Sequence, residues 1–90
     1  MTLMNQVKND VNNMVNNESF EYCEIIYDGE DSIEDNVWLY DFNIYDDDED
    51  RIIALEEKLN NMQYVKATLY CNLDDGDYTI ETVIDIGGWY

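Results

Sequence analysis

Two alternating runs separated by a turn sequence limit the fold of this 90-residue chain more than any other feature. In residues 65–73 and again in residues 78–86, mostly apolar side chains recur at every second position, as in strands that bury one face. Between these runs stands Asp74-Asp75-Gly76-Asp77, which is typical of a hairpin turn. The C-terminal part of the chain is therefore predicted to be a β-hairpin.

A second hairpin is predicted in the N-terminal half. Residues 20–27 are rich in β-branched and aromatic types, which favour a strand. A polar segment begins at Asp28-Gly29 and extends to Asn36, and a second strand follows over 37–45. On one face of that strand we expect Trp38, Tyr40, Phe42 and Ile44; on the other we expect Asp41 and Asn43, with Val37, Leu39 and Tyr45.

Each hairpin is preceded by a segment with helical spacing. Apolar residues recur at steps of three and four from Leu3 to Val15, which predicts an amphipathic helix that ends near Asn16 and Asn17. A second apolar stripe runs from Ile52 to Met62. The acids before it suit a helix N-terminus, because carboxylates accept from its free N–H groups and favour the positive end of the dipole.

These elements predict one α+β domain over residues 1–90, in the order α-β-β-α-β-β. We expect a four-stranded antiparallel sheet with both helices packed on one face. The two hairpin turns are expected at related ends of the sheet. The acidic run Asp46–Asp50 is expected at the opposite end.

The charge balance restricts function more than fold. The chain has 22 Asp and Glu against four Lys and Arg, giving −18, and residues 9–50 contain fifteen acids and no basic residue. A hydrophobic content of 46% is too high for a disordered acidic tail. Direct nucleic-acid binding is excluded, because affinity for phosphates depends on Lys and Arg. Solubility or adaptation to salt is the general alternative reading of such a charge.

The cellular setting is predicted from what the sequence lacks. The N-terminus shows no secretory signal, and no segment approaches the roughly 20 apolar residues of a membrane span. We therefore expect a cytoplasmic protein, in the host cytoplasm if a phage encodes it. Cys23 and Cys71 are expected to be free and buried in strands.

Catalysis is not predicted. The chain has no His, no nucleophile elbow and no phosphate-binding glycine loop, and no cofactor is expected. Asp46, Asp48, Asp50 and Glu57 match four places of a calcium-binding loop. Arg51 stands where that loop needs Gly, and the apolar stripe indicates that helix has already begun. We therefore predict no specific metal site.

The candidate surface for a partner consists of three acidic clusters. Its members are Asp28, Glu30, Asp31, Glu34, Asp35, Asp46, Asp47, Asp48, Glu49, Asp50, Asp74, Asp75 and Asp77. Aromatic side chains among these acids would add contacts to Arg or apolar groups. Those expected on the exposed sheet face are Tyr27, Tyr45, Tyr70 and Trp89. The same face is also a candidate surface for a homodimer.

The blocks "DGEDSIED", "DDDED" and "LDDGD", in a short chain without His, resemble the DNA-mimic inhibitors of phages and mobile elements. These include anti-CRISPR, anti-restriction and uracil-glycosylase-inhibitor proteins. The resemblance is compositional and covers the whole chain. It implies inhibition of a DNA-binding enzyme by occupation of its DNA channel, often the site that reads a short duplex motif, with a CRISPR effector as the preferred target class.

Two alternatives remain open at this point. An immunity or antitoxin protein that blocks a basic nuclease toxin would use nearly the same electrostatics. A regulatory adaptor with a solubilising acidic surface would instead tolerate charge-neutral substitutions in "DDDED".

Overall fold

The helices and strands follow the expected order along the chain. The computed structural model describes residues 2–27, 36–72 and 77–87. They form α1 (Leu3–Asn17), β1 (Tyr22–Tyr27), β2 (Val37–Tyr45), α2 (Glu49–Asn60), β3 (Val65–Cys71) and β4 (Asp77–Asp85). The predicted α-β-β-α-β-β order is therefore confirmed.

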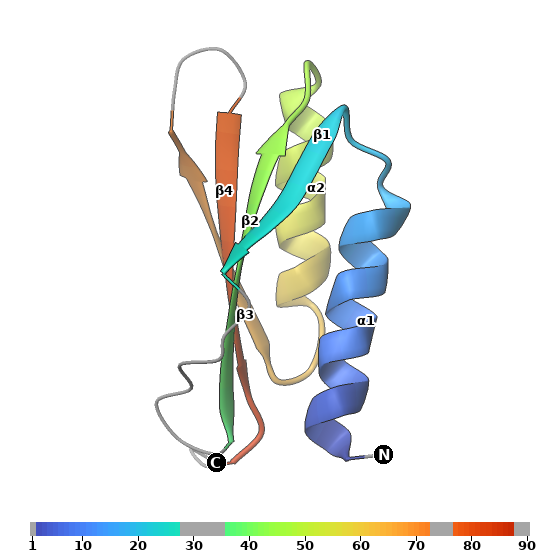
Figure 1. The fold of residues 1–90 in the computed structure, drawn as a ribbon, viewed down its shortest axis with the longest axis vertical. Helices are drawn as coiled ribbons and strands as arrows, with labels where there is room; N and C mark the ends of the chain where they lie inside the picture. The colour runs from blue at the N-terminus through green and yellow to red at the C-terminus, as the bar shows by residue number, and fades with distance from the viewer. Residues whose placement is uncertain (1, 28–35, 73–76, 88–90) are drawn as a thin grey trace.

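The four strands form one antiparallel sheet in the order β1-β2-β4-β3. Both helices lie on one face of this sheet, so the predicted two-layer α+β fold is confirmed (Figure 1). Among the described residues, no helix covers the opposite face, which is called the open face. β2 and β4 form the centre of the sheet, and β1 and β3 are its two edges.

The core lies between the helices and the sheet, as the two periodicities require. Helical steps of three and four align one apolar stripe, and alternation aligns one apolar face of each strand. The fully buried side chains include Val11 and Val15 of α1, Ile52, Leu55 and Leu59 of α2, Phe42 and Ile44 of β2, and Ile80 and Ile84 of β4. Thr82 is also buried, and its hydroxyl donates to the Tyr40 carbonyl at 3.3 Å.

β1 differs from the other strands because none of its residues belongs to the buried core. All of its residues except Tyr27 are exposed, and its pairing with β2 is irregular between Ile25 and Tyr27. This strand is therefore held mainly by its ladder with β2. The connection from α1 to β1 is also joined by polar contacts to the acidic segment after β2 and to α2.

Candidate functional site

The acidic run Asp46–Asp50 does not lie at the expected end of the sheet. Tyr45, the last residue of β2, is paired in register with Asp77, the first residue of β4. The run Asp46–Asp50 therefore lies at the same end as Asp77, and this end is called the acidic end. Val37 pairs with Asp85 at the other end, where β2 begins and β4 ends.

The expectation that Asp46–Asp50 lies at the opposite end from the second hairpin is therefore wrong, and β2 begins at the other end of the sheet from the start of β4. The physical reason is that β4 pairs antiparallel with β2, which inverts the second hairpin relative to the first. Seven of the predicted site residues lie outside the described residues. They are Asp28, Glu30, Asp31, Glu34, Asp35, Asp74 and Asp75.

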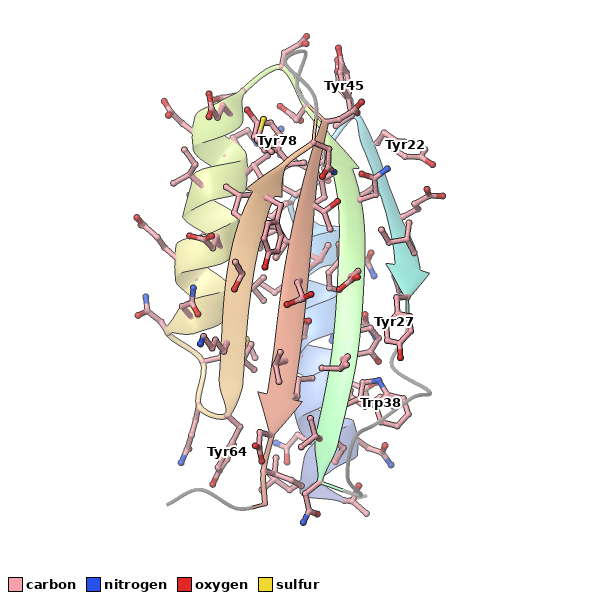
Figure 2. All side chains as sticks on the ribbon, turned by 90° about the vertical axis from the view of Figure 1, so that its left-hand side faces the viewer. Tyr22, Tyr27, Trp38, Tyr45, Tyr64 and Tyr78 are labelled. Carbon is pink, nitrogen blue, oxygen red and sulfur yellow. The ribbon has the colours of Figure 1, made fainter. Side chains whose placement is uncertain are left out.

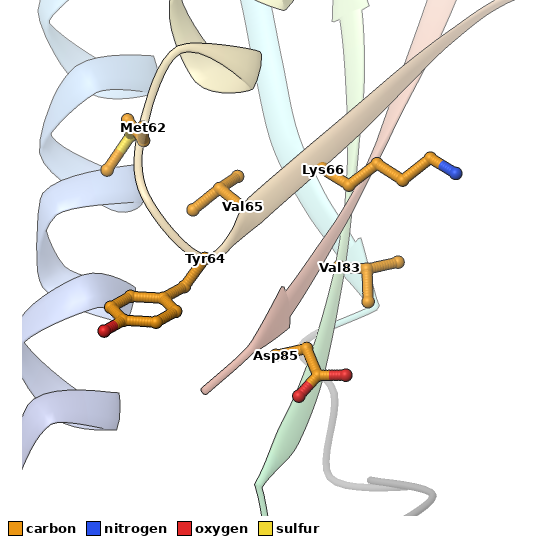
Figure 3. A pocket seen from close by; sticks show the side chains of 6 residues that line it. All are labelled: Met62, Tyr64, Val65, Lys66, Val83 and Asp85. Carbon is orange, nitrogen blue, oxygen red and sulfur yellow. The ribbon is translucent and has the colours of Figure 1, made fainter. Parts of the chain in front are cut away.

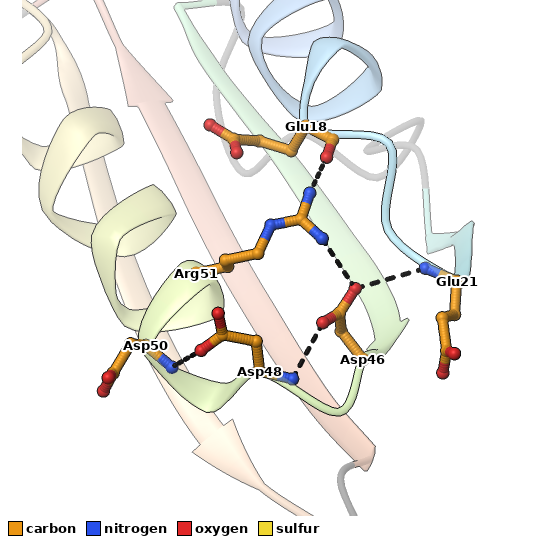
Figure 4. Close-up of polar contacts among 6 residues, drawn as sticks. All are labelled: Glu18, Glu21, Asp46, Asp48, Asp50 and Arg51. Atoms are coloured by element: carbon orange, nitrogen blue, oxygen red, sulfur yellow. Dashed lines mark hydrogen bonds and ion pairs between the residues drawn. The ribbon is translucent and has the colours of Figure 1, made fainter.

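Asp46 is used inside the protein. It is 5% exposed, and its carboxylate accepts from the backbone N–H of Asp48 at 2.8 Å and from that of Glu21 at 3.3 Å (Figure 4). The Arg51 guanidinium lies 3.0 Å from the same carboxylate. The Asp48 N–H is the main cause of a lowered Asp46 pKa, with smaller contributions from Glu21 and Arg51. Asp46 therefore joins the connection before β1 to the start of α2.

The rest of the acidic run forms the start of α2, as the sequence predicted. Asp48 is the N-cap residue, and its carboxylate accepts from the Asp50 N–H at 3.1 Å. Asp47, Glu49 and Asp50 are exposed around this N-terminus, with the Tyr45 hydroxyl donating to Asp47 at 3.3 Å. Three exposed carboxylates therefore remain available for a partner, beside a helix end that itself favours negative charge.

The calcium-loop pattern does not form a calcium loop here. α2 already begins at Glu49, so Arg51 lies inside the helix, and the Asp46 and Asp48 carboxylates accept backbone N–H groups. Among residues 2–27, 36–72 and 77–87, no group of three or more His, Cys, Asp or Glu side chains is placed to hold a metal ion.

The open face carries a second set of acids, of which the sequence prediction had included Asp77 alone. Strand register places five carboxylates on this face. They belong to Glu24, Asp41, Asp77, Glu81 and Asp85. The alternation of residues in β2 and β4 predicts from sequence that the acids of each strand share one face. Only the register between the two strands shows that Asp41 and Glu81 lie opposite each other.

Asp41 and Glu81 are partners in register on the two central strands. Both side chains are half-buried. Partial desolvation raises the pKa of Asp41, and the neighbouring charge of Glu81 raises it further. Like charges directly opposite each other destabilise a sheet, so the pair is unfavourable for folding alone.

Four tyrosines lie on the open face around these acids. Tyr22, Tyr27 and Tyr45 share the face with Asp41 by register, and Figure 2 shows their positions along β1 and at the end of β2. Tyr70 pairs with Thr79 on the same face and is 48% exposed. The expected placement of Tyr27, Tyr45 and Tyr70 is confirmed, whereas Trp89 lies outside the described residues.

The four basic residues do not neutralise this surface. Lys8 lies over the Trp38 ring, with its Nζ atom 3.5 Å from the centroid. Arg51 contacts Asp46 and donates to the Glu18 carbonyl (Figure 4). Lys58 forms an ion pair with the Glu18 carboxylate at 2.9 Å. Only Lys66, on β3, shares the open face with the five acids.

A pocket of about 560 Å³ lies at the opposite end from the acidic run (Figure 3). Its lining comprises Met62, Tyr64, Val65, Lys66, Val83 and Asp85. Most of this lining is apolar, and the chargeable groups are one ammonium, one carboxylate and one phenol. Its described lining has no carboxylate pair and no thiol or aliphatic hydroxyl nucleophile, so it is a weaker functional candidate than the acidic surface.

The two cysteines differ from expectation. Cys23 and Cys71 are both free, as predicted, but both are exposed rather than buried. The reason is that each lies on an edge strand, Cys23 on β1 and Cys71 at the end of β3, beyond the helical cover. Partial desolvation raises the pKa of the Cys23 thiol, and Glu24 adds to this effect, which lowers its reactivity.

No protein-family model, curated protein or solved structure matches this chain. Within the described residues, no helix is long and apolar enough to cross a membrane. The geometry and charge of the acidic surface are therefore the features that point to a function.

Proposed function

We propose that this protein is a DNA-mimic inhibitor that occupies the basic DNA-binding site of another protein. A CRISPR effector is the preferred target class, with the motif-reading site as the contact. The proposed contact surface joins the exposed acids at the start of α2 to the five carboxylates of the open face. This revises the surface expected from sequence, because Asp46 is withdrawn and Glu24, Asp41, Glu81 and Asp85 are added.

One observation carries the proposal: the sheet holds carboxylates in fixed positions while three of the four basic residues are engaged elsewhere. Same-face residues repeat at roughly 6.6 Å along a strand, and opposite residues on neighbouring strands are closer still. DNA presents one negative charge per roughly 1.7 Å of its axis. A basic channel built for that charge density would attract this face and accelerate association.

The half-buried Asp41–Glu81 pair supports a binding role over a purely solubilising one. Solubility requires only exposed charge, and charge on the helices serves it equally well. A repulsive pair at the centre of the sheet lowers stability without improving solubility. Partner cations placed against both carboxylates would relieve the repulsion.

A matched pair of double variants tests the proposal. Asp41→Asn with Glu81→Gln removes two charges from the open face, and Asp10→Asn with Glu57→Gln removes two from exposed positions on the helices. Each would be used to capture partners from a host lysate, followed by competition with duplex DNA. We expect the first variant to bind the captured DNA-binding protein at least tenfold more weakly and the second to bind normally.

Three outcomes would contradict the proposal. They are equal binding by both double variants, simultaneous binding of duplex DNA and this protein by the partner, and an affinity that does not fall with rising salt. The immunity-protein alternative differs only in its target, so the identity of the captured protein decides it.

A further inference from the structure

The two edges of the sheet are treated differently by the fold. At the β3 edge, the Asn60 side chain accepts from the Ala67 N–H at 2.8 Å and donates to the Ala67 carbonyl at 2.9 Å. The Glu56 carboxylate accepts from the Leu69 N–H at 2.6 Å. Both side chains come from α2, so a helix satisfies the backbone groups that a neighbouring strand would otherwise use. The β3 edge is closed by these contacts.

The direction of the β1 backbone groups follows from the same contacts. Ala67 and Leu69 direct backbone hydrogen-bonding groups away from β4. In an antiparallel sheet, successive residues direct these groups to alternate sides of the strand, so the direction at Ala67 determines the direction at every paired residue of the other strands. The Asn72 N–H to Asp77 carbonyl bond and the Asp85 N–H to Tyr64 carbonyl bond, both 3.0 Å, agree with this phase.

When this alternation is followed through the β4–β2 and β2–β1 pairs, the backbone N–H and C=O groups of Tyr22 and Glu24 point toward β2. The backbone N–H and C=O groups of Cys23 and Ile25 point outward, away from the sheet. In the part of the chain that the structure describes, no side chain closes this edge as Asn60 closes the other.

The side chains along this edge are also unusually apolar for an exposed strand. Tyr22, Ile25 and Ile26 are 48%, 49% and 51% exposed. An edge that presents unpaired N–H and C=O groups beside exposed apolar side chains is a template for another strand. The contrast with the closed β3 edge makes β1 the edge at which addition can occur.

Charge decides between the two kinds of strand that could be added. A second copy would bring two chains of net charge −18 together, with Glu24 of each copy on the pairing strand. A basic partner segment would gain from the same field. The side chains of this segment on the open face would lie beside Glu24 and within reach of Asp41 on β2. Its side chains on the helical face would lie beside Cys23 and Ile25.

We infer that β1 accepts an extended segment of the partner protein as a fifth strand, and that Lys or Arg alternates with apolar residues in this segment. The inference rests on the proposed function only for the sign of the partner's charge. It adds a directional backbone contact to a surface that otherwise binds by charge alone, and it places that contact next to the carboxylates of the open face.

The test uses a synthetic probe, an end-blocked octapeptide that alternates Lys and Val, titrated into the intact protein. Binding should slow amide exchange at Cys23 and Ile25, while Tyr22 and Glu24, already turned toward β2, change little. A peptide of the same sequence with N-methyl groups on alternate residues keeps the charge but loses the N–H donors on one of its two edges. Two such peptides are needed, one methylated on the odd-numbered residues and one on the even-numbered residues. One of the two should bind at least tenfold more weakly than the unmodified peptide.

Two variants test the protein side. Ile25→Pro removes an outward N–H and should weaken peptide binding at least fivefold, whereas Ile25→Val keeps that N–H and should bind normally. Cys23→Pro provides an independent test if Ile25→Pro does not fold, and the methylated peptides do not depend on either variant.

Equal binding of the unmodified and both methylated peptides would overturn strand addition and leave the proposed function standing. A dimer of the protein alone that Ile25→Pro dissociates, seen by sedimentation, would also overturn the inference, because the edge would then belong to a second copy. Failure of the open-face double variant to weaken partner binding would instead contradict the proposed function.

Discussion

Asp41 and Glu81 lie directly opposite each other on the two central strands, with both carboxylates on the open face. Partial desolvation and the Glu81 charge raise the pKa of Asp41. Such a pair is expected on a surface adapted to bind the basic side chains of a partner rather than to maximise stability.

Removing one of these charges should therefore stabilise the protein. We expect Asp41→Asn to raise the free energy of unfolding by about 0.2–1 kcal/mol, because like charges directly opposite in a sheet oppose folding by that order. Urea denaturation at neutral pH measures this difference. Asp10→Asn, on the exposed side of α1, is the control and should change stability by less than about 0.5 kcal/mol. A destabilised Asp41→Asn variant would show that the carboxylate makes favourable contacts.

The same pair predicts a dependence on pH. The folded pKa of Asp41 lies above its ordinary value of 3.8, so the folded state binds the proton more tightly than the unfolded state does. The cost of ionised Asp41 is fully present above the folded pKa, declines as pH falls from the folded pKa toward 3.8, and is absent below 3.8. The stability advantage of Asp41→Asn should shrink between the folded pKa and 3.8. Unfolding curves of both proteins between neutral and acidic pH test this, and an advantage independent of pH would contradict it.

Asp46 should show the opposite dependence. Its pKa is lowered in the folded state, chiefly by the Asp48 N–H, so its stabilisation is present above 3.8 and lost as pH falls through the folded value. Asp46→Ala should cause the largest loss of stability among alanine substitutions in the run 46–50. Thermal unfolding at neutral and acidic pH measures it, with exposed Asp47→Ala as the control. Equal effects of the two substitutions would contradict the structural role of Asp46.

The closed edge of β3 depends on one amide side chain. Asn60→Ala removes both bonds to Ala67 and leaves two backbone groups without that partner, so we expect a loss of about 1–3 kcal/mol in the free energy of unfolding. Amide exchange at Ala67 should accelerate. Asn61→Ala, at the next position, keeps the Asn60 contacts and should leave this exchange unchanged. Normal protection of Ala67 in the Asn60 variant would show that its bonds are not needed.

Local patterns were sufficient for most of the fold. The helical stripe of α1, the alternation of β2 and β4, and the acids before Ile52 each identified an element and its buried face. These signals operate within one segment, where the spacing of side chains dictates which face is buried. Residues 20 and 21 precede the observed β1, a small difference at an element boundary.

The relations between segments could not be predicted in the same way. Whether Asp46–Asp50 lies beside Asp77 depends on β2 pairing with β4, which is a choice between distant strands. The Asp41–Glu81 pair depends on the register of that pairing. Cys23 is exposed because β1 lies at the edge of the sheet beyond the core, a position that no local pattern records.

The closure of β3 by α2 also limits the size of any assembly. A sheet that grows into a filament needs two receptive edges on every subunit, one to accept a strand and one to offer the next site. Among the described residues, β1 is the one edge of this subunit without such closure. Two copies joined through β1 would therefore turn only β3 edges outward, and growth by strand addition between copies would end with the pair, even at high protein concentration.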